Sequence, residues 1–169
     1  VLVLYENWNV QHRVRQALET IFHTTEEQLN VEDRTIVTLD CGLQCVFRSL
    51  PADSVLTQYG EGTEAIDAVA PIVDDYQQAG RRLLVIAETL SDDLVRKEGG
   101  KNAVDPKKQI RAELARKGVL TQFIQSNGVV SRKELSDDPN YAGKRAVWDL
   151  MRGAGLFPVP LSVRNVKSS

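Results

Sequence analysis

The stretch RRLLVIAETL, residues 81–90, decides the fold. Residues 83–87 within it are continuously apolar. A strand with this composition is typical of a parallel sheet that is buried on both faces. Because the segments on either side alternate between strand-like and helix-like patterns, we predict an α/β domain. The expected architecture is a Rossmann-like three-layer domain with a mostly parallel sheet flanked by helices.

The residues before that stretch supply further strands and a helix. Residues 1–6, VLVLYE, form a short apolar run that predicts a buried strand. Apolar residues then recur at three- and four-residue spacings over 10–22, as in an amphipathic helix, and Asn9 is the expected N-cap. Residues 34–40 have the β-branched composition of a second strand, whereas 43–50 fit either a strand or a short helix.

The residues after that stretch continue the alternation. Asp105-Pro106 is the expected N-cap and first residue of a helix, which ends at Gly118. VLTQFIQ, residues 119–125, predicts the next strand. Two more helices are expected, over residues 62–80 and 140–155.

The bulk composition is that of a soluble globular protein, with 42% apolar and 26% charged residues. No apolar run is long enough to cross a membrane, and the start has neither Met nor a basic signal-peptide region. We therefore expect a cytoplasmic protein without membrane contact, cut from a longer chain. We assign residues 1–160 to one domain and 161–169 to a tail or to the beginning of a following domain.

Residues suited to catalysis or metal binding are few and scattered. Cys41 and Cys45 lie far from His12 and His23 in the sequence, so the paired spacings of a zinc site are missing and reduced thiols are expected. The Gly-rich phosphate-binding motifs and the G-x-S-x-G nucleophile motif are absent. Acidic pairs occur at 74–75, 92–93 and 137–138, and sequence neighbours on a helix do not share a face. We expect no enzyme activity, no metal and no cofactor.

The distribution of charge is more informative than the net charge of −2. Residues 1–104 contain nine Lys and Arg against seventeen Asp and Glu, a balance of −8. Residues 105–169 contain twelve against six, a balance of +6. Such asymmetry is found in proteins that bind nucleic acid, although solvated faces can also differ by chance.

A basic cluster stands at the beginning of the helix that follows Asp105. Lys107, Lys108 and Arg111 lie where the helix dipole disfavours cations and attracts anions. This local conflict indicates a function, namely holding an anion. Arg116 and Lys117 lie at the other end of that helix, where the dipole alone accounts for them.

Three further basic residues and one amide join this set. Lys144 and Arg145 lie near the start of the last helix, and Arg152 follows two turns later on the face of Arg145. Gln122 lies within an apolar strand and has an amide that must find hydrogen-bond partners. A structural Gln and a ligand-binding Gln fit this position equally well.

These residues carry a resemblance to a known family. RKGVLTQFIQ resembles the MID domain of Argonaute and PIWI proteins. The longer pattern DPKKQIRAELARKGVLTQFI, with AVWDLMRGAG further on, is closer still to the MID region of bacterial PIWI-RE proteins. The resemblance implies a domain that holds the 5′ phosphate of a guide strand, RNA or DNA.

The resemblance also implies roles for single residues. Gln122 matches the family's strand Gln, and the family's helix Lys falls at or beside Arg111, with Ile110 directly in register. No aromatic residue matches the family's base-stacking position, which falls near Pro106 and Lys107. The family's later Lys matches Arg152 best, with Lys144 and Arg145 as alternatives.

Partners follow from the same resemblance. In the family a nuclease-type PIWI domain of the RNase H kind follows the MID domain, and helicase and endonuclease-like proteins are associated with it in prokaryotic defence. Two other interpretations remain: a protein-interaction domain with a degenerate pocket, and a small-nucleotide-binding α/β domain, against which the absent Gly-rich loop argues.

Overall fold

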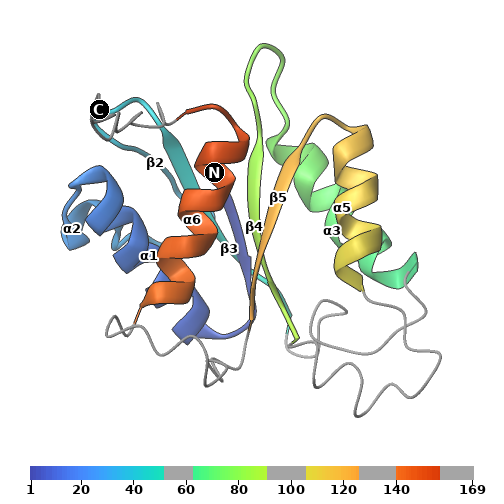
Figure 1. Cartoon of the computed structure of the whole chain (residues 1–169), viewed down its shortest axis with the longest axis horizontal. Helices are drawn as coiled ribbons and strands as arrows, with labels where there is room; N and C mark the ends of the chain where they lie inside the picture. The colour runs from blue at the N-terminus through green and yellow to red at the C-terminus, as the bar shows by residue number, and fades with distance from the viewer. Residues whose placement is uncertain (52–62, 91–105, 126–139, 157–169) are drawn as a thin grey trace, which may run out of the picture.

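The computed structural model describes residues 1–51, 63–90, 106–125 and 140–156, and its central feature is a five-stranded sheet (Figure 1). The strand order is β2-β3-β1-β4-β5. Neighbouring strands are parallel except β2, which pairs antiparallel with β3 at one edge. The predicted mostly parallel α/β sheet is confirmed. The strands are β1 (Leu2–Tyr5), β2 (Ile36–Thr38), β3 (Gln44–Ser49), β4 (Leu84–Thr89) and β5 (Leu120–Gln125).

Helices cover both faces of this sheet and complete the three-layer arrangement (Figure 1). One face carries α1 (Trp8–Phe22) and α6 (Tyr141–Gly153), with the short α2 (Glu26–Leu29) beside α1. The other face carries α3 (Thr63–Tyr76) and α5 (Pro106–Arg116). Within the described ranges, no helix is long and apolar enough to cross a membrane.

The core consists of two apolar layers, one on each side of the sheet. β4 is buried along all six residues, as the continuous apolar run predicted. Its side chains alternate: Ile86 packs in the layer of α1 and α6, whereas Val85 packs in the layer of α3 and α5. The same alternation in β1 sends Val3 to the first layer and Leu4 to the second.

Local signals explain where several elements begin and end. Gly118 has a φ of +73°, and the amide of Val119 donates to Leu114 O, which ends α5 close to the predicted position. The predicted N-cap of α1 is wrong: Asn7, and not Asn9, is the cap, and its side chain accepts from the amide of Asn9. A cap must precede the first helical residue with extended backbone, which Asn7 has.

The remaining sequence predictions divide into settled and unplaced ones. Residues 43–50, which fitted two structures, contain strand β3. Three further predictions concern residues outside the described ranges: the cap at Asp105, the acidic pairs at 92–93 and 137–138, and the tail 161–169.

The parallel topology brings three helix starts to one edge of the sheet. β1, β4 and β5 all end at the carboxyl edge, the lower edge in Figure 1, and α1, α5 and α6 follow them in the chain. All three helices run back towards the amino edge, where Arg82 donates to the carbonyl of Ala154 just after α6. Ligands of such sheets bind outside the carboxyl ends of the strands, so this edge is the place to look for a site.

Candidate functional site

Four of the seven basic and amide residues singled out in the sequence lie near the carboxyl edge. Lys107 and Lys108 lie in the first turn of α5, and Lys144 and Arg145 lie in the first two turns of α6. These two helix starts flank β5 on opposite faces of the sheet. Lys108 and Arg145 are exposed, whereas Lys107 and Lys144 are half-buried. The fold therefore places four cations near the carboxyl edge, two on each face of the sheet.

Gln122 and Arg111 lie on opposite faces of β5. Gln122 is half-buried and aligned with Ile86 of β4, on the same side of the strand as Ile124, which packs in the layer of α1 and α6. Phe123 points the other way, and the guanidinium carbon of Arg111 lies 5.2 Å from its ring centroid. A single ligand group reaches both side chains only along the outer edge of β5, which is the edge strand of the sheet.

Arg152 is placed away from the carboxyl edge. It lies in the last turn of α6, near the amino edge, about 12 Å along the helix axis from Lys144 at 1.5 Å per residue. Its guanidinium is 3.7 Å from one carboxylate oxygen of Asp149. The other oxygen of Asp149 lies 3.6 Å from the guanidinium of Arg145. The structure therefore does not bring Arg152 together with Lys107 and Lys108.

A residue that the sequence interpretation missed, Glu88, closes the turn between β1 and α1. It is 1% exposed, and one of its carboxylate oxygens accepts from the amides of Glu6 and Asn7 at 2.7 and 2.8 Å. Dinucleotide-binding folds place the ligand's phosphates on this turn. Because the carboxylate of Glu88 already accepts from these amides, they are not available to bind a phosphate at this turn.

The start of α6 is held against α1 by close backbone contacts. Asn140 donates through its side-chain amide to the carbonyl of Arg13 at 2.8 Å. A Cβ on Gly143 would lie 2.7 Å from that same carbonyl oxygen, so only glycine fits here. This contact sets the position of Lys144 and Arg145 relative to the sheet.

Comparison with known protein families identifies the kind of domain. Residues 15–162 match the family model described as the MID domain of pPIWI_RE, which is most of the chain. The chain belongs to this family. A search of curated proteins found no match. The match confirms the resemblance noted at residues 105–125 and 144–155.

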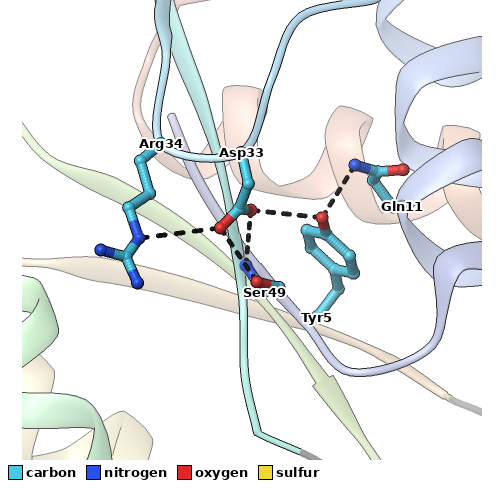
Figure 2. A network of polar contacts seen from close by, with 5 residues as sticks. All are labelled: Tyr5, Gln11, Asp33, Arg34 and Ser49. Carbon is cyan, nitrogen blue, oxygen red and sulfur yellow. Dashed lines mark hydrogen bonds and ion pairs between the residues drawn. The ribbon is translucent and has the colours of Figure 1, made fainter.

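A second polar network of this MID domain stabilises the ends of β1 and β3 (Figure 2). The Tyr5 hydroxyl donates to Asp33 at 3.2 Å and accepts from the side chain of Gln11 at 2.9 Å. Asp33 also accepts from the amide and the hydroxyl of Ser49, and Arg34 lies 3.8 Å from it. Burial, followed by the charge of Asp33, raises the pKa of Tyr5. Tyr5 therefore stays protonated at neutral pH, and the network ties the segment before β2 to two central strands.

A hollow of the MID domain lies at the amino edge, far from the basic helix starts. It has a volume of about 790 Å³, and Ile36, Cys45, Arg81 and Leu156 are among the residues that line it. This edge is not where α/β sheets bind their ligands. We therefore give the hollow no part in the site.

Within the described ranges, no three His, Cys, Asp or Glu side chains lie close enough together to hold a metal ion. Cys41 is exposed and Cys45 is buried, and both are free thiols. Burial raises the pKa of Cys45 to about 11. Its thiol is therefore protonated and unreactive at neutral pH.

Proposed function

We propose that this MID domain binds the 5′-phosphorylated end of a guide strand at the carboxyl edge of its sheet. The observation that supports this most strongly is the pair Lys107 and Lys108 in the first turn of α5, where cations oppose the helix dipole. A phosphate at that position would be attracted by both the positive end of the helix dipole and the lysines. The role is binding without catalysis.

α6 supplies the second group of cations. Lys144 and Arg145 lie at its start on the opposite face of the sheet, so a strand that crosses the carboxyl edge would meet cations on both faces. Arg145 offers the planar, bidentate donors that match phosphate oxygens. Gln122 and Arg111 flank the outer edge of β5, along which the first nucleotide would lie.

Oligonucleotide binding tests this function directly. The affinities of the chain for one single-stranded oligonucleotide with a 5′ phosphate and with a 5′ hydroxyl are measured at fixed salt, as RNA and as DNA. We expect an affinity about tenfold or more higher for the phosphorylated end, from at least one charge-assisted contact. Equal affinities for the two ends, in RNA and in DNA, would contradict the proposal.

A charge-removal variant separates the site from general attraction. Lys107→Ala with Lys108→Ala should abolish the preference for the 5′ phosphate and reduce the slope of log affinity against log salt by up to about 1.4, since each single-strand phosphate contact contributes about 0.7. Arg116→Ala is the matched control, because Arg116 lies at the other end of α5 and pairs with Glu113 at 2.8 Å. That control should keep the preference.

A second candidate is a protein-interaction domain. The observation that favours it is the separation of Arg111, Gln122 and Arg152, which do not share one face, together with the missing aromatic at the stacking position. The partner would be the PIWI domain of the same protein, or the helicase and endonuclease proteins implied by the resemblance. Binding of a purified PIWI domain without any oligonucleotide binding would favour this candidate.

A further inference from the structure

The outer face of α6 carries aromatic and basic side chains together. The helix packs inward through Gly143, Ala146, Val147, Leu150 and Met151. At 100° per residue, Tyr141, Arg145, Trp148 and Arg152 project within about 60° of one another on the opposite side. Their exposure agrees with this: Tyr141 is 39% and Trp148 44% exposed, and the side chains of Arg145 and Arg152 are 55% and 66% exposed.

Aromatic and cationic side chains alternate along this face. The order is Tyr141, Arg145, Trp148, Arg152, and successive members are separated by about 4.5 to 6 Å along the helix axis. One carboxylate, Asp149, lies at ion-pair distance from both arginines. Exposed pairs of this kind are weak and screened by salt, so both guanidinium groups can turn to a polyanion.

We propose that these four residues, the α6 strip, bind single-stranded nucleic acid beyond its first nucleotide. Bases stack on Trp148 and Tyr141, and backbone phosphates pair with Arg145 and Arg152. The strip begins at the carboxyl edge beside Lys144, so it leads a strand away from the proposed 5′ end site. This inference rests on nucleic-acid binding by the domain, and it does not require recognition of the 5′ phosphate. In this proposal Arg152 binds a backbone phosphate beyond the first nucleotide.

The chemistry of the strip favours a nucleic acid over a protein. The exposed side of α5 is basic too, with Lys108, Arg111 and Arg116, but it carries no aromatic residue. Only the α6 strip, of these two helices, offers a stacking surface for bases as well as charge for phosphates. The anchors of protein interfaces fill desolvated pockets, whereas Trp148 and Tyr141 stand on the convex outer side of a helix.

Tryptophan fluorescence gives a local readout, because the chain has only two tryptophans, Trp8 and Trp148. In Trp8→Phe the emission comes from Trp148 alone. Titration with a single-stranded 5′-hydroxyl oligothymidylate should quench this emission in a saturable way, since stacking on a base deactivates the excited indole. The Trp148→Phe variant, which reports only Trp8, should show less quenching.

Affinity measurements test the energetic share of the strip. Trp148→Ala should weaken binding of 5′-phosphate and 5′-hydroxyl oligonucleotides alike by about 5- to 100-fold, which is the range for loss of one stacked base. Trp148→Phe retains an aromatic face and should lose less. Arg152→Ala, which leaves the proposed 5′ end site intact, should reduce the salt slope by about 0.7, and Arg116→Ala, from α5, should leave the affinity unchanged. Melting temperatures show that each variant is folded.

The outcomes separate this inference from the proposed function. One outcome is that the strip variants lose affinity equally for 5′-phosphate and 5′-hydroxyl oligonucleotides, while the unaltered chain binds both with the same affinity. The strip is then supported and the 5′ end site is contradicted. If the 5′ phosphate is preferred but the strip variants bind like the unaltered chain, the strip fails alone. Unchanged Trp148 emission at saturating oligonucleotide also overturns it, as does emission that changes with protein concentration alone, which would indicate a protein contact.

Discussion

The two helical layers of this MID domain differ in the burial and the position of their polar contacts. On one face, Glu88 binds the turn before α1 and Asn140 binds the carbonyl of Arg13, both near the carboxyl edge. On the other face, the polar contacts between α3 and α5 lie at their far ends, where Lys117 pairs with Asp74 at 2.6 Å and Gln77 donates to the carbonyl of Lys117.

The difference matters because the candidate site lies at the carboxyl edge. The start of α6 is held there by a part-buried hydrogen bond from Asn140 to α1, whereas the contacts of Lys117 with Asp74 and Gln77 are exposed and lie at the amino edge. The layer of α1 and α6 therefore has a tertiary hydrogen bond at the edge where the candidate site lies, and both layers carry cations there. Four substitutions test this division, in order of decreasing effect.

The largest effect is expected at Glu88. Glu88→Ala leaves the amides of Glu6 and Asn7 without their acceptor in a buried turn, which should lower the free energy of unfolding by about 3–5 kcal/mol for two charge-assisted hydrogen bonds. Asp74→Ala, on the other layer, breaks an exposed pair and should cost about 1 kcal/mol or less. Denaturant titration measures both, and similar losses would remove the contrast between the layers.

The next effect is expected at the close approach of α6 to α1. A Cβ at Gly143 meets Asn140 Oδ1 at 2.5 Å as well as the carbonyl of Arg13, so Gly143→Ala must push the helices apart and should cost about 2–3 kcal/mol. Gly153→Ala is the matched control in the same helix, because no atom lies within 4 Å of its added Cβ. The control should be neutral or stabilising by up to about 1 kcal/mol. A stable Gly143→Ala protein would show that this contact does not hold α6 in place.

A smaller effect is expected where α5 meets the edge strand. Arg111→Ala removes the cation over the ring of Phe123 and should lower the free energy of unfolding by about 0.5–1 kcal/mol. Arg111→Lys keeps a cation near the ring and should recover part of that loss. Thermal unfolding of both variants checks this, and a loss as large as that of Gly143→Ala would mean that the α5 layer is as tightly held as the α6 layer.

The smallest change in stability is expected at Asp149. Asp149→Asn removes the carboxylate between Arg145 and Arg152, and the free energy of unfolding should change by less than about 0.5 kcal/mol because the pairs are exposed. The affinity for single-stranded oligonucleotides should rise about two- to fivefold, since both guanidinium groups lose a competing anion. Glu113→Gln makes the same change on α5, beside Arg116, and should leave the affinity unaltered. A rise for both variants would indicate general charge attraction.

Much of the fold was predictable because its signals are local. The apolar run at 83–87, the helical spacing over 10–22 and the turn at Gly118 depend on residues close together in the chain, and the structure confirms each. The family, too, was recognisable from two short motifs. The pattern at 43–50 remained ambiguous because short apolar runs fit a strand or a helix equally well.

The arrangement of the site was less accessible. Gln122 and Arg111 were grouped by their place in a motif, but adjacent residues of a strand face opposite ways, and Arg111 follows Phe123 to the other side of β5. The sequence contains Trp148 and Tyr141 but does not show that they are exposed, because their exposure depends on which face of α6 packs against α1. Glu88 offered one signal, an acidic residue at the end of an otherwise apolar strand.

The sequence by itself determined most of the order of strands and helices, the position of the basic helix starts and the family to which the chain belongs. Hydrophobic period, capping and motif are properties of neighbouring residues, so they can be read along the chain. Only the tertiary structure decided that Glu88 closes the first turn, that Asn140 reaches a carbonyl 127 residues away and that the cations divide between two faces. These contacts join segments that are distant in the sequence. The segments come within hydrogen-bonding distance only when the helices pack on the sheet.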